Sequence, residues 1–134
     1  MGRYLTLQTK VFSVFGTPEW QAEGVRTVPD NFTPPDTAEE FIRINIVPSN
    51  TGINIASLSG ICLIEIYTAF GAGTSRINEI ADKLDKYLLG KSIGVGSQTV
   101  QFGISTAAPR GQDKINPLLT RQDYTIPFNL FGVY

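Results

Sequence analysis

The sequence predicts an α+β protein, in which an antiparallel β-sheet of about four main strands carries two helices on one face. Apolar residues recur with a period of two in residues 41–47 and 123–131, and with a helical period in residues 74–89. The elements follow the order α-β-β-α-β-β, and two hairpins separated by one helix favour a single covered sheet. We expect one domain, residues 1–134, because this length builds one hydrophobic core.

The first element is predicted to be a helix over residues 4–15, YLTLQTKVFSVF. Part of this stretch also fits an alternating pattern, but Gly16-Thr17-Pro18 is a typical helix stop and favours the helix. Residues 16–38 are rich in proline and glycine, and we expect them to cross the surface without long elements. Trp20 lies in this crossing, either as an exposed interface anchor or as a lid over the core, the commoner role.

The next strand is predicted over residues 41–47, FIRINIV, and should end at Pro48. Its three isoleucines share one face, while Arg43 and Asn45 lie on the other. A half-buried strand gives this alternation, because successive side chains point to opposite faces of a sheet.

Residues 61–70, ICLIEIYTAF, predict a second strand with apolar residues on both faces, which suggests a central position. Glu65 lies in its middle and needs a partner if it is buried. A cross-strand pair with Arg43 is favoured over a role at a subunit interface. Cys62, the single cysteine, is interpreted as an inert core residue, because no histidine is present to activate it.

Residues 74–89 give the clearest helix. Thr74 or Ser75 can cap its start, and Gly90 suits the left-handed position after its end. Its apolar stripe consists of Ile77, Ile80, Ala81, Leu84, Tyr87 and Leu88.

The last third of the chain is predicted to hold a short strand at residues 93–95, a main strand at 98–105, a long loop at 106–121 and a closing strand at 123–131. In the main strand, Val100, Phe102 and Ile104 should share one face. Pro127 cannot donate a ladder hydrogen bond, so the closing strand should lie at an edge or bulge there.

Composition restricts the function. Eleven basic and twelve acidic residues give a net charge of -1, whereas proteins that grip nucleic acid tightly carry a basic excess. Histidine is absent, which removes the commonest general base and metal ligand, and no cofactor is expected. No apolar run reaches the roughly 20 residues of a membrane helix. The N-terminus lacks a signal-peptide pattern, so we expect synthesis in a cytoplasm without membrane attachment.

Two stretches could hold a ligand. Gly71 to Ser75 precede a helix and could bind phosphate through backbone N–H groups, but they lack the lysine and spacing of a P-loop. A strand-to-helix turn is the favoured interpretation. Asp82 and Asp85 could form a weak cation site, but Lys83 and Lys86 beside them favour a solvated charged face.

With these segments in place, the chain resembles the tail terminator (tail completion) proteins of long-tailed phages. The resemblance covers nearly the whole chain. It is carried by the order and spacing of YLTLQTKVFSVF, PEWQAEGVRTVPDNFTPP, EFIRINIVP, ICLIEIYTAFGAGTSRINEIADKLDKYLLGKSI and YTIPFNLF. Pro127 in the last segment departs from the family pattern and puts pairing between subunits along that strand in doubt.

The resemblance implies a virion protein of the phage tail and neck. It would form a ring, typically of six subunits, on the head-proximal end of the tail tube, stopping tube polymerisation and offering a surface to the head connector (stopper). The partners implied are copies of itself, the tail tube protein and the connector. Genomic DNA would pass through the lumen without specific binding.

Residues 49–60 and 106–121 are long connections for so small a domain, and loops of this length are usually functional. In the first, Ile53, Ile55 and Leu58 would be costly to leave in water, so we expect them to contact a neighbouring subunit. In the second, Arg110, Lys114 and Arg121 are candidates for charged contacts with an adjacent ring. Three alternatives stay open: another head–tail joining protein, a small enzyme that binds phosphate at Gly71 to Ser75, and a monomeric binding module.

Overall fold

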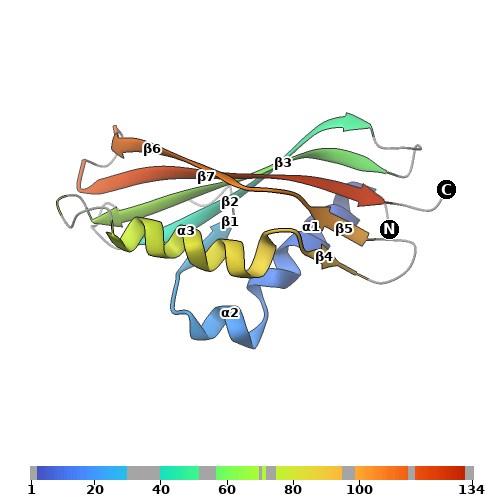
Figure 1. Cartoon of the computed structure of the whole chain (residues 1–134), viewed down its shortest axis with the longest axis horizontal. Coiled ribbons are helices and arrows are strands. Elements are labelled where there is room, and N and C mark those ends of the chain that lie inside the picture. The colour runs from blue at the N-terminus through green and yellow to red at the C-terminus, as the bar shows by residue number, and fades with distance from the viewer. Residues whose placement is uncertain are drawn as a thin grey trace.

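The computed structural model describes residues 3–29, 40–51, 57–69, 71, 75–94, 99–114 and 117–131. Its helices all lie on one face of a curled sheet (Figure 1). The elements are α1 (Arg3–Phe15), α2 (Pro18–Ala22), β1 (Thr27–Pro29), β2 (Phe41–Thr51), β3 (Leu58–Ala69), α3 (Ser75–Leu88), β4 (Ser92–Ile93), β5 (Thr99–Phe102), β6 (Thr106–Gln112) and β7 (Leu119–Phe131).

The sheet runs in the order β1-β2-β3-β7-β5-β4, and β6 pairs with β7. Among the described strands, only β1 pairs in parallel, with β2; the other pairings are antiparallel. The α+β class and the two long helices on one face are confirmed. The described part of the chain has seven strands, more than the four expected, and the short helix α2 was also not expected.

The prediction of a long loop at residues 106–121 is wrong, because most of this segment belongs to a β-hairpin. β6 pairs with β7 from Thr106 opposite Thr125 to Gln112 opposite Thr120, with a register shift between Pro109 and Gly111. Every residue of β6 is exposed. Backbone pairing therefore holds this strand without a buried face, and no apolar alternation marks it in the sequence.

The connection at residues 49–60 is also shorter than expected. β2 continues through Pro48, with a register shift between Pro48 and Asn50, and ends at Thr51; β3 already begins at Leu58. A proline beside such an irregularity does not interrupt a regular ladder. The predicted end of the strand at Pro48 is therefore wrong.

Pro127 lies in an interior strand, and its pairing with β3 shows no register shift, so the prediction of an edge or a bulge at this proline is wrong. β7 pairs with β3 on one side and with β5 and then β6 on the other, and Pro127 falls between the last two. Its carbonyl accepts a hydrogen bond from Gly103 N at 2.9 Å. Because N and C=O of one strand residue point to the same neighbour, the missing N–H faces the break between β5 and β6 and removes no ladder bond. At this break Ile104 is 81% exposed and lies beyond the end of β5, whereas Val100 and Phe102 are buried, so the prediction that the three share one face of a strand is wrong.

The main core fills the space between the helices and the sheet. It includes Cys62, Ile64 and Ile66 of β3 and Tyr124, Ile126 and Phe128 of β7. Trp20 is fully buried and donates its indole N–H to Thr27 Oγ1 at 2.9 Å, which confirms the lid interpretation. Burial raises the pKa of the Cys62 thiol to about 12, as expected of an inert core cysteine.

Helix α3 lies on the sheet as its periodicity predicts. Ile77, Ile80, Ala81, Leu84 and Leu88 are buried, and Tyr87 packs against the core while partly exposed. Gly90 has φ 65°, the left-handed conformation predicted for it. Asp85 links the helix to the sheet, because it accepts hydrogen bonds from Tyr124 OH at 2.6 Å and Ser105 Oγ at 2.5 Å.

Candidate interaction surface

No described element covers the face of the sheet opposite the helices, which we call the open face (Figure 1). Side chains here stand in rows across β2, β3 and β7, because paired residues of neighbouring strands point to the same side. One row is Val47, Ile61 and Pro127, all exposed. Two rows further along is a charged row: Arg43, Glu65 and Asp123.

The charged row is the centre of an ion-pair network across four strands. Arg43 of β2 pairs with Glu65 of β3, which confirms the predicted cross-strand pair. Arg121 Nη2 lies 2.9 Å from Glu65 Oε1, and Arg121 Nε lies 2.8 Å from Asp123 Oδ1. Arg110 Nε of β6 lies 2.8 Å from Asp123 Oδ2. Two carboxylates are thus held by three guanidinium groups.

The network buries its carboxylates and leaves its cations nearer the solvent. Side-chain exposure is 8% for Glu65 and 6% for Asp123, but 60% for Arg110. Burial alone would raise the pKa of Glu65, but hydrogen bonds from Arg43 and Asn45 and the charge of Arg121 hold that pKa below its ordinary value.

The pKa of Asp123 is lowered in the same way. Burial opposes the shift, and the hydrogen bonds and charges of Arg121 and Arg110 outweigh it. Burial and the nearby Glu65 carboxylate raise the pKa of Tyr67 to about 12, so its hydroxyl stays protonated and donates to Glu65 Oε1 at 3.3 Å.

Beside this network, a charged pocket of about 610 Å³ is lined by Arg110, Gln112, Asp113, Lys114, Arg121 and Asp123. The structure thus brings together Arg110, Lys114 and Arg121, the three cations chosen from the sequence. They do not come from a loop as expected, since Arg110 lies in β6 and Arg121 in β7. Arg121 is held by two carboxylates of its own chain, and Arg110 by one, Asp123. Among the described residues of the pocket, Arg110 and Lys114 are the exposed cations.

The apolar candidates have different outcomes. Ile53 and Ile55 lie outside the described residues. Leu58 is 3% exposed and belongs to the core of its own chain. The assumption that it is exposed, which suggested an intersubunit contact, is therefore wrong. Val47, Ile61 and Ile104, which the sequence analysis did not select, are exposed apolar residues of the described chain.

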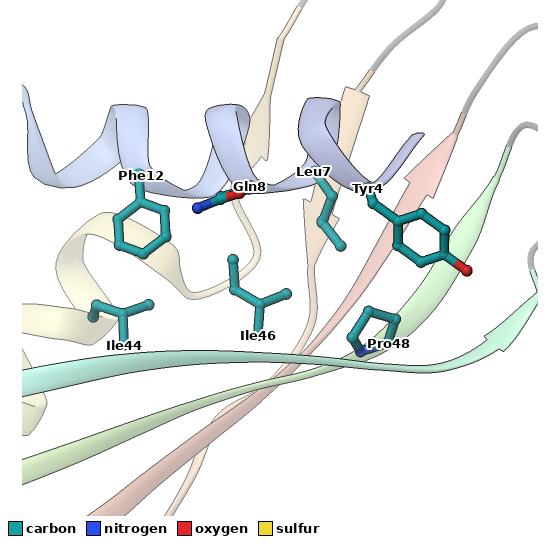
Figure 2. Close-up of a pocket in the computed structure, with 7 residues that line it drawn as sticks. All are labelled: Tyr4, Leu7, Gln8, Phe12, Ile44, Ile46 and Pro48. Atoms are coloured by element: carbon teal, nitrogen blue, oxygen red, sulfur yellow. The ribbon is translucent and has the colours of Figure 1, made fainter. Parts of the chain in front are cut away.

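A second hollow runs along α1. Figure 2 shows this hollow between the helix and β2. Its volume is about 340 Å³, and its lining consists of Tyr4, Leu7, Gln8 and Phe12 from α1 and Ile44, Ile46 and Pro48 from β2. An adjoining hollow of about 360 Å³ shares Gln8 and Phe12 and continues towards Val28 and Pro29. None of the described residues that line these two hollows is charged. We call the two together the α1 groove.

The glycine turn before α3 is described only in part. Gly71 has φ 90°, a conformation that favours glycine and fits the turn interpretation. Residues 72–74 lie outside the described residues, so the phosphate hypothesis for Gly71 to Ser75 is not tested. Asp82 and Asp85 do not act together, because Asp85 turns to Tyr124 and Ser105 and Asp82 is exposed.

The described residues include no group of three His, Cys, Asp or Glu that could hold a metal ion. None of the helices seen here is long and apolar enough to cross a membrane. What the described surfaces offer chemically is contact: buried carboxylates that fix arginines, exposed cations at a pocket, an apolar row and an uncharged groove.

Comparisons with known proteins identify a shared fold. No protein-family model and no curated protein matches the sequence. A solved structure whose name states no function aligns with a TM-score of 0.63 at 10% identity, covering 96% of each chain. A chain from the virion of a native gene transfer agent particle aligns with a TM-score of 0.52 at 16% identity, covering 98% of this chain and 92% of that one. At such identities the likeness shows the fold alone.

Proposed function

We propose that this chain is a structural subunit of a phage-like particle. The observation that carries the proposal is the fold shared with a gene transfer agent virion chain over 98% of this sequence. The exposed surfaces support it, because an assembly subunit needs faces that become buried against neighbours. A role of this kind needs no catalytic group, and the composition, which lacks histidine, suits it.

Within such a particle, we propose the role of tail terminator. The chain forms a ring, expected to be a hexamer, on the head-proximal end of the tail tube. One side of the ring binds the last ring of tube protein and stops polymerisation, while the other side receives the head connector. This role rests on the sequence resemblance given above. Another joining position in the neck is the alternative.

Specific contacts follow from the charged pocket. Arg110 and Lys114 are proposed to meet carboxylates of an adjacent ring, since both are exposed. Arg110 also keeps its ion pair with Asp123 of its own chain. Ile53 and Ile55 are proposed to contact a neighbouring subunit. The net charge of -1 suits a lumen through which DNA slides without specific binding.

The test is to polymerise the tube protein of the same genome with and without this protein. Electron microscopy should show tubes capped at one end and shorter when the protein is present. Binding to the connector without any effect on tubes would favour the neck alternative. No binding to either would contradict both roles.

A matched pair of variants tests the contacts. Arg110→Glu with Lys114→Glu should weaken capping at least tenfold, because two attractive charges become repulsive. Lys91→Glu, an exposed lysine outside the pocket, should leave capping unchanged. Equal capping by both variants would exclude the pocket from the tube contact. Changing Ile53 and Ile55 to Asp should abolish assembly while the circular dichroism spectrum stays unchanged.

A further inference from the structure

The α1 groove is open because the sheet stops short beside it. β1 pairs only with Ile42 to Ile44 of β2, and the structure describes no strand against the outer edge of β2 beyond that point. Pro48 lies along this edge and has no N–H to offer another strand. The region is therefore better suited to receive side chains than to extend the sheet.

Ile104 lies at the break between β5 and β6, with β3 and β7 between it and β2 in the strand order. It is the most exposed large apolar residue among those described, at 81%. The bend that presents it is fixed on three sides. Gly103 N donates to Pro127 O at 2.9 Å, Gly103 O accepts from Gly90 N at 3.1 Å, and Ser105 Oγ donates to Asp85 at 2.5 Å. A side chain on such a bend is pre-organised, so burying it against a partner loses little conformational entropy.

The chain segment that carries Ile104 has no charged residue, since residues 92–109, SIGVGSQTVQFGISTAAP, hold no acidic or basic side chain. Nearby charges belong to other segments: Asp85, which Ser105 contacts, and Lys91, whose carbonyl accepts from Phe102 N. Every residue of the edge strand β6 is exposed, and Arg110 is the single charged residue of that strand. Soluble proteins usually protect an exposed edge with charges, so an edge with a single charge is a place where another chain can associate. Pro109 in β6 weakens strand pairing here, as Pro48 does at β2.

The two surfaces complement each other in apolar character and position. None of the described residues that line the α1 groove is charged, so an Ile104 side chain that entered it would meet no charge among them. The groove lies at β2, and Ile104 lies beyond β7, with β3 and β7 between them in the sheet. A knob and a groove on opposite sides of one subunit give a head-to-tail contact, which closes into a ring when the rotation fits.

We propose that the occupant of the α1 groove is a second copy of this chain, whose Ile104 inserts between α1 and β2. The contact joins subunits through side chains and not through a continuous sheet. The inference deepens the proposed function, because it rests on the ring and names the surfaces that build it.

The test uses two single-cysteine variants, Gln8→Cys in the groove and Ile104→Cys at the bend, and a short bismaleimide crosslinker. Gln8 is exposed and lines both halves of the groove. The native Cys62 is fully buried and its pKa is raised to about 12, so it should not react. The crosslinker is added to the assembled protein, alone or on tubes.

Mixing the two single variants should give crosslinked dimers, and the double variant should give a ladder ending at the ring size. Each single variant alone should give none; dimers of Ile104→Cys alone would indicate a symmetric contact and overturn the proposal. Assembled rings without any crosslink between positions 8 and 104 would overturn this contact but would not contradict the proposed function. A chain that stays monomeric even with tube protein would contradict both.

Ile104→Asp provides a second test that needs no crosslinker. It should abolish self-association, and Gln8→Arg in the same chain should restore part of it by supplying a cation across the contact. Ile61→Asp is the matched control, because it places the same charge on the open face. If Ile61→Asp abolishes self-association and Ile104→Asp does not, subunits associate through the open face and the proposal is wrong.

Discussion

The two faces of the sheet show how one set of strands serves two purposes. Leu63 and Ile64 are neighbours in β3, yet Ile64 is fully buried beneath the helices while Leu63 is partly exposed on the open face. The covered face is held by the main apolar core. The open face is held by ion pairs between strands and by a smaller apolar cluster of Val28, Phe41, Tyr67 and Leu119. Stability should therefore depend mainly on the main core, and association on side chains that stay exposed around it.

The sharpest way to test this difference is to shorten both neighbours. Ile64→Ala should lower the free energy of unfolding by about 2–5 kcal/mol, because it leaves a cavity in a packed core. Leu63→Ala should lower it by less than about 1 kcal/mol, since its site can fill with water. Urea denaturation of both variants measures the difference, and equal losses would show that the open face is covered.

Removing a buried carboxylate should have the next largest effect. Glu65→Gln leaves Arg43 and Arg121 without a shared counter-charge and should cost about 1–3 kcal/mol, less than a fully buried pair because both arginines reach solvent. Glu79→Gln, whose carboxylate is 55% exposed on α3, should change stability by less than about 0.5 kcal/mol. Chemical denaturation at pH 7 compares the two, and a null effect of Glu65→Gln would mean that the network adds nothing to stability.

The same network predicts a pH dependence. The pKa values of Glu65 and Asp123 are lowered in the folded protein, so these groups bind protons more readily when the chain unfolds. Their contribution is complete above the ordinary carboxyl range and is lost as the pH falls through the lowered values. The free energy of unfolding should fall more steeply from pH 7 to pH 3 for the native protein than for the double variant Glu65→Gln with Asp123→Asn. The pH dependence that remains in the double variant includes the contribution of Glu40, because the hydrogen bond from Arg76 lowers the pKa of that carboxyl. Equal slopes would contradict the assignment.

The smallest contrast compares two tyrosines. Tyr124→Phe removes a hydrogen bond to Asp85 on the covered face and should cost about 1–2 kcal/mol. Tyr67→Phe removes a longer bond that the hydroxyl donates to Glu65, 3.3 Å, and one of 3.1 Å that it accepts from Arg43. It should cost less than about 1 kcal/mol, because Arg43 and Glu65 still hold each other in an ion pair. Thermal and urea unfolding of both variants gives the order of the two effects, and the reverse order would contradict it.

The covered face was largely predictable from the sequence. Ile77, Ile80 and Leu84 repeat at helical spacing, and Ile42 and Ile44 alternate, so burial leaves a periodic pattern that can be read. The pair between Arg43 and Glu65 followed from placing a charged residue in the middle of each of two strands.

The sheet edges could not be predicted in the same way. β6 has no buried face, and β1 and β4 have three and two residues, so none carries an apolar period. Pro48 and Pro127 suggested ends and edges, but each lies where the ladder is irregular or broken, and only the neighbouring strands decide this. Arg110, Lys114 and Arg121 were selected from a supposed loop and nevertheless meet at one pocket, because a hairpin also brings its two ends together.

The most direct measurement is the tail length in particles produced with and without an intact copy of the gene for this chain. With the gene, mass spectrometry should find the protein in purified particles and tails should have one length. Without it, electron microscopy should show overlong tubes that carry no heads. Normal, head-bearing particles without the protein would contradict the account.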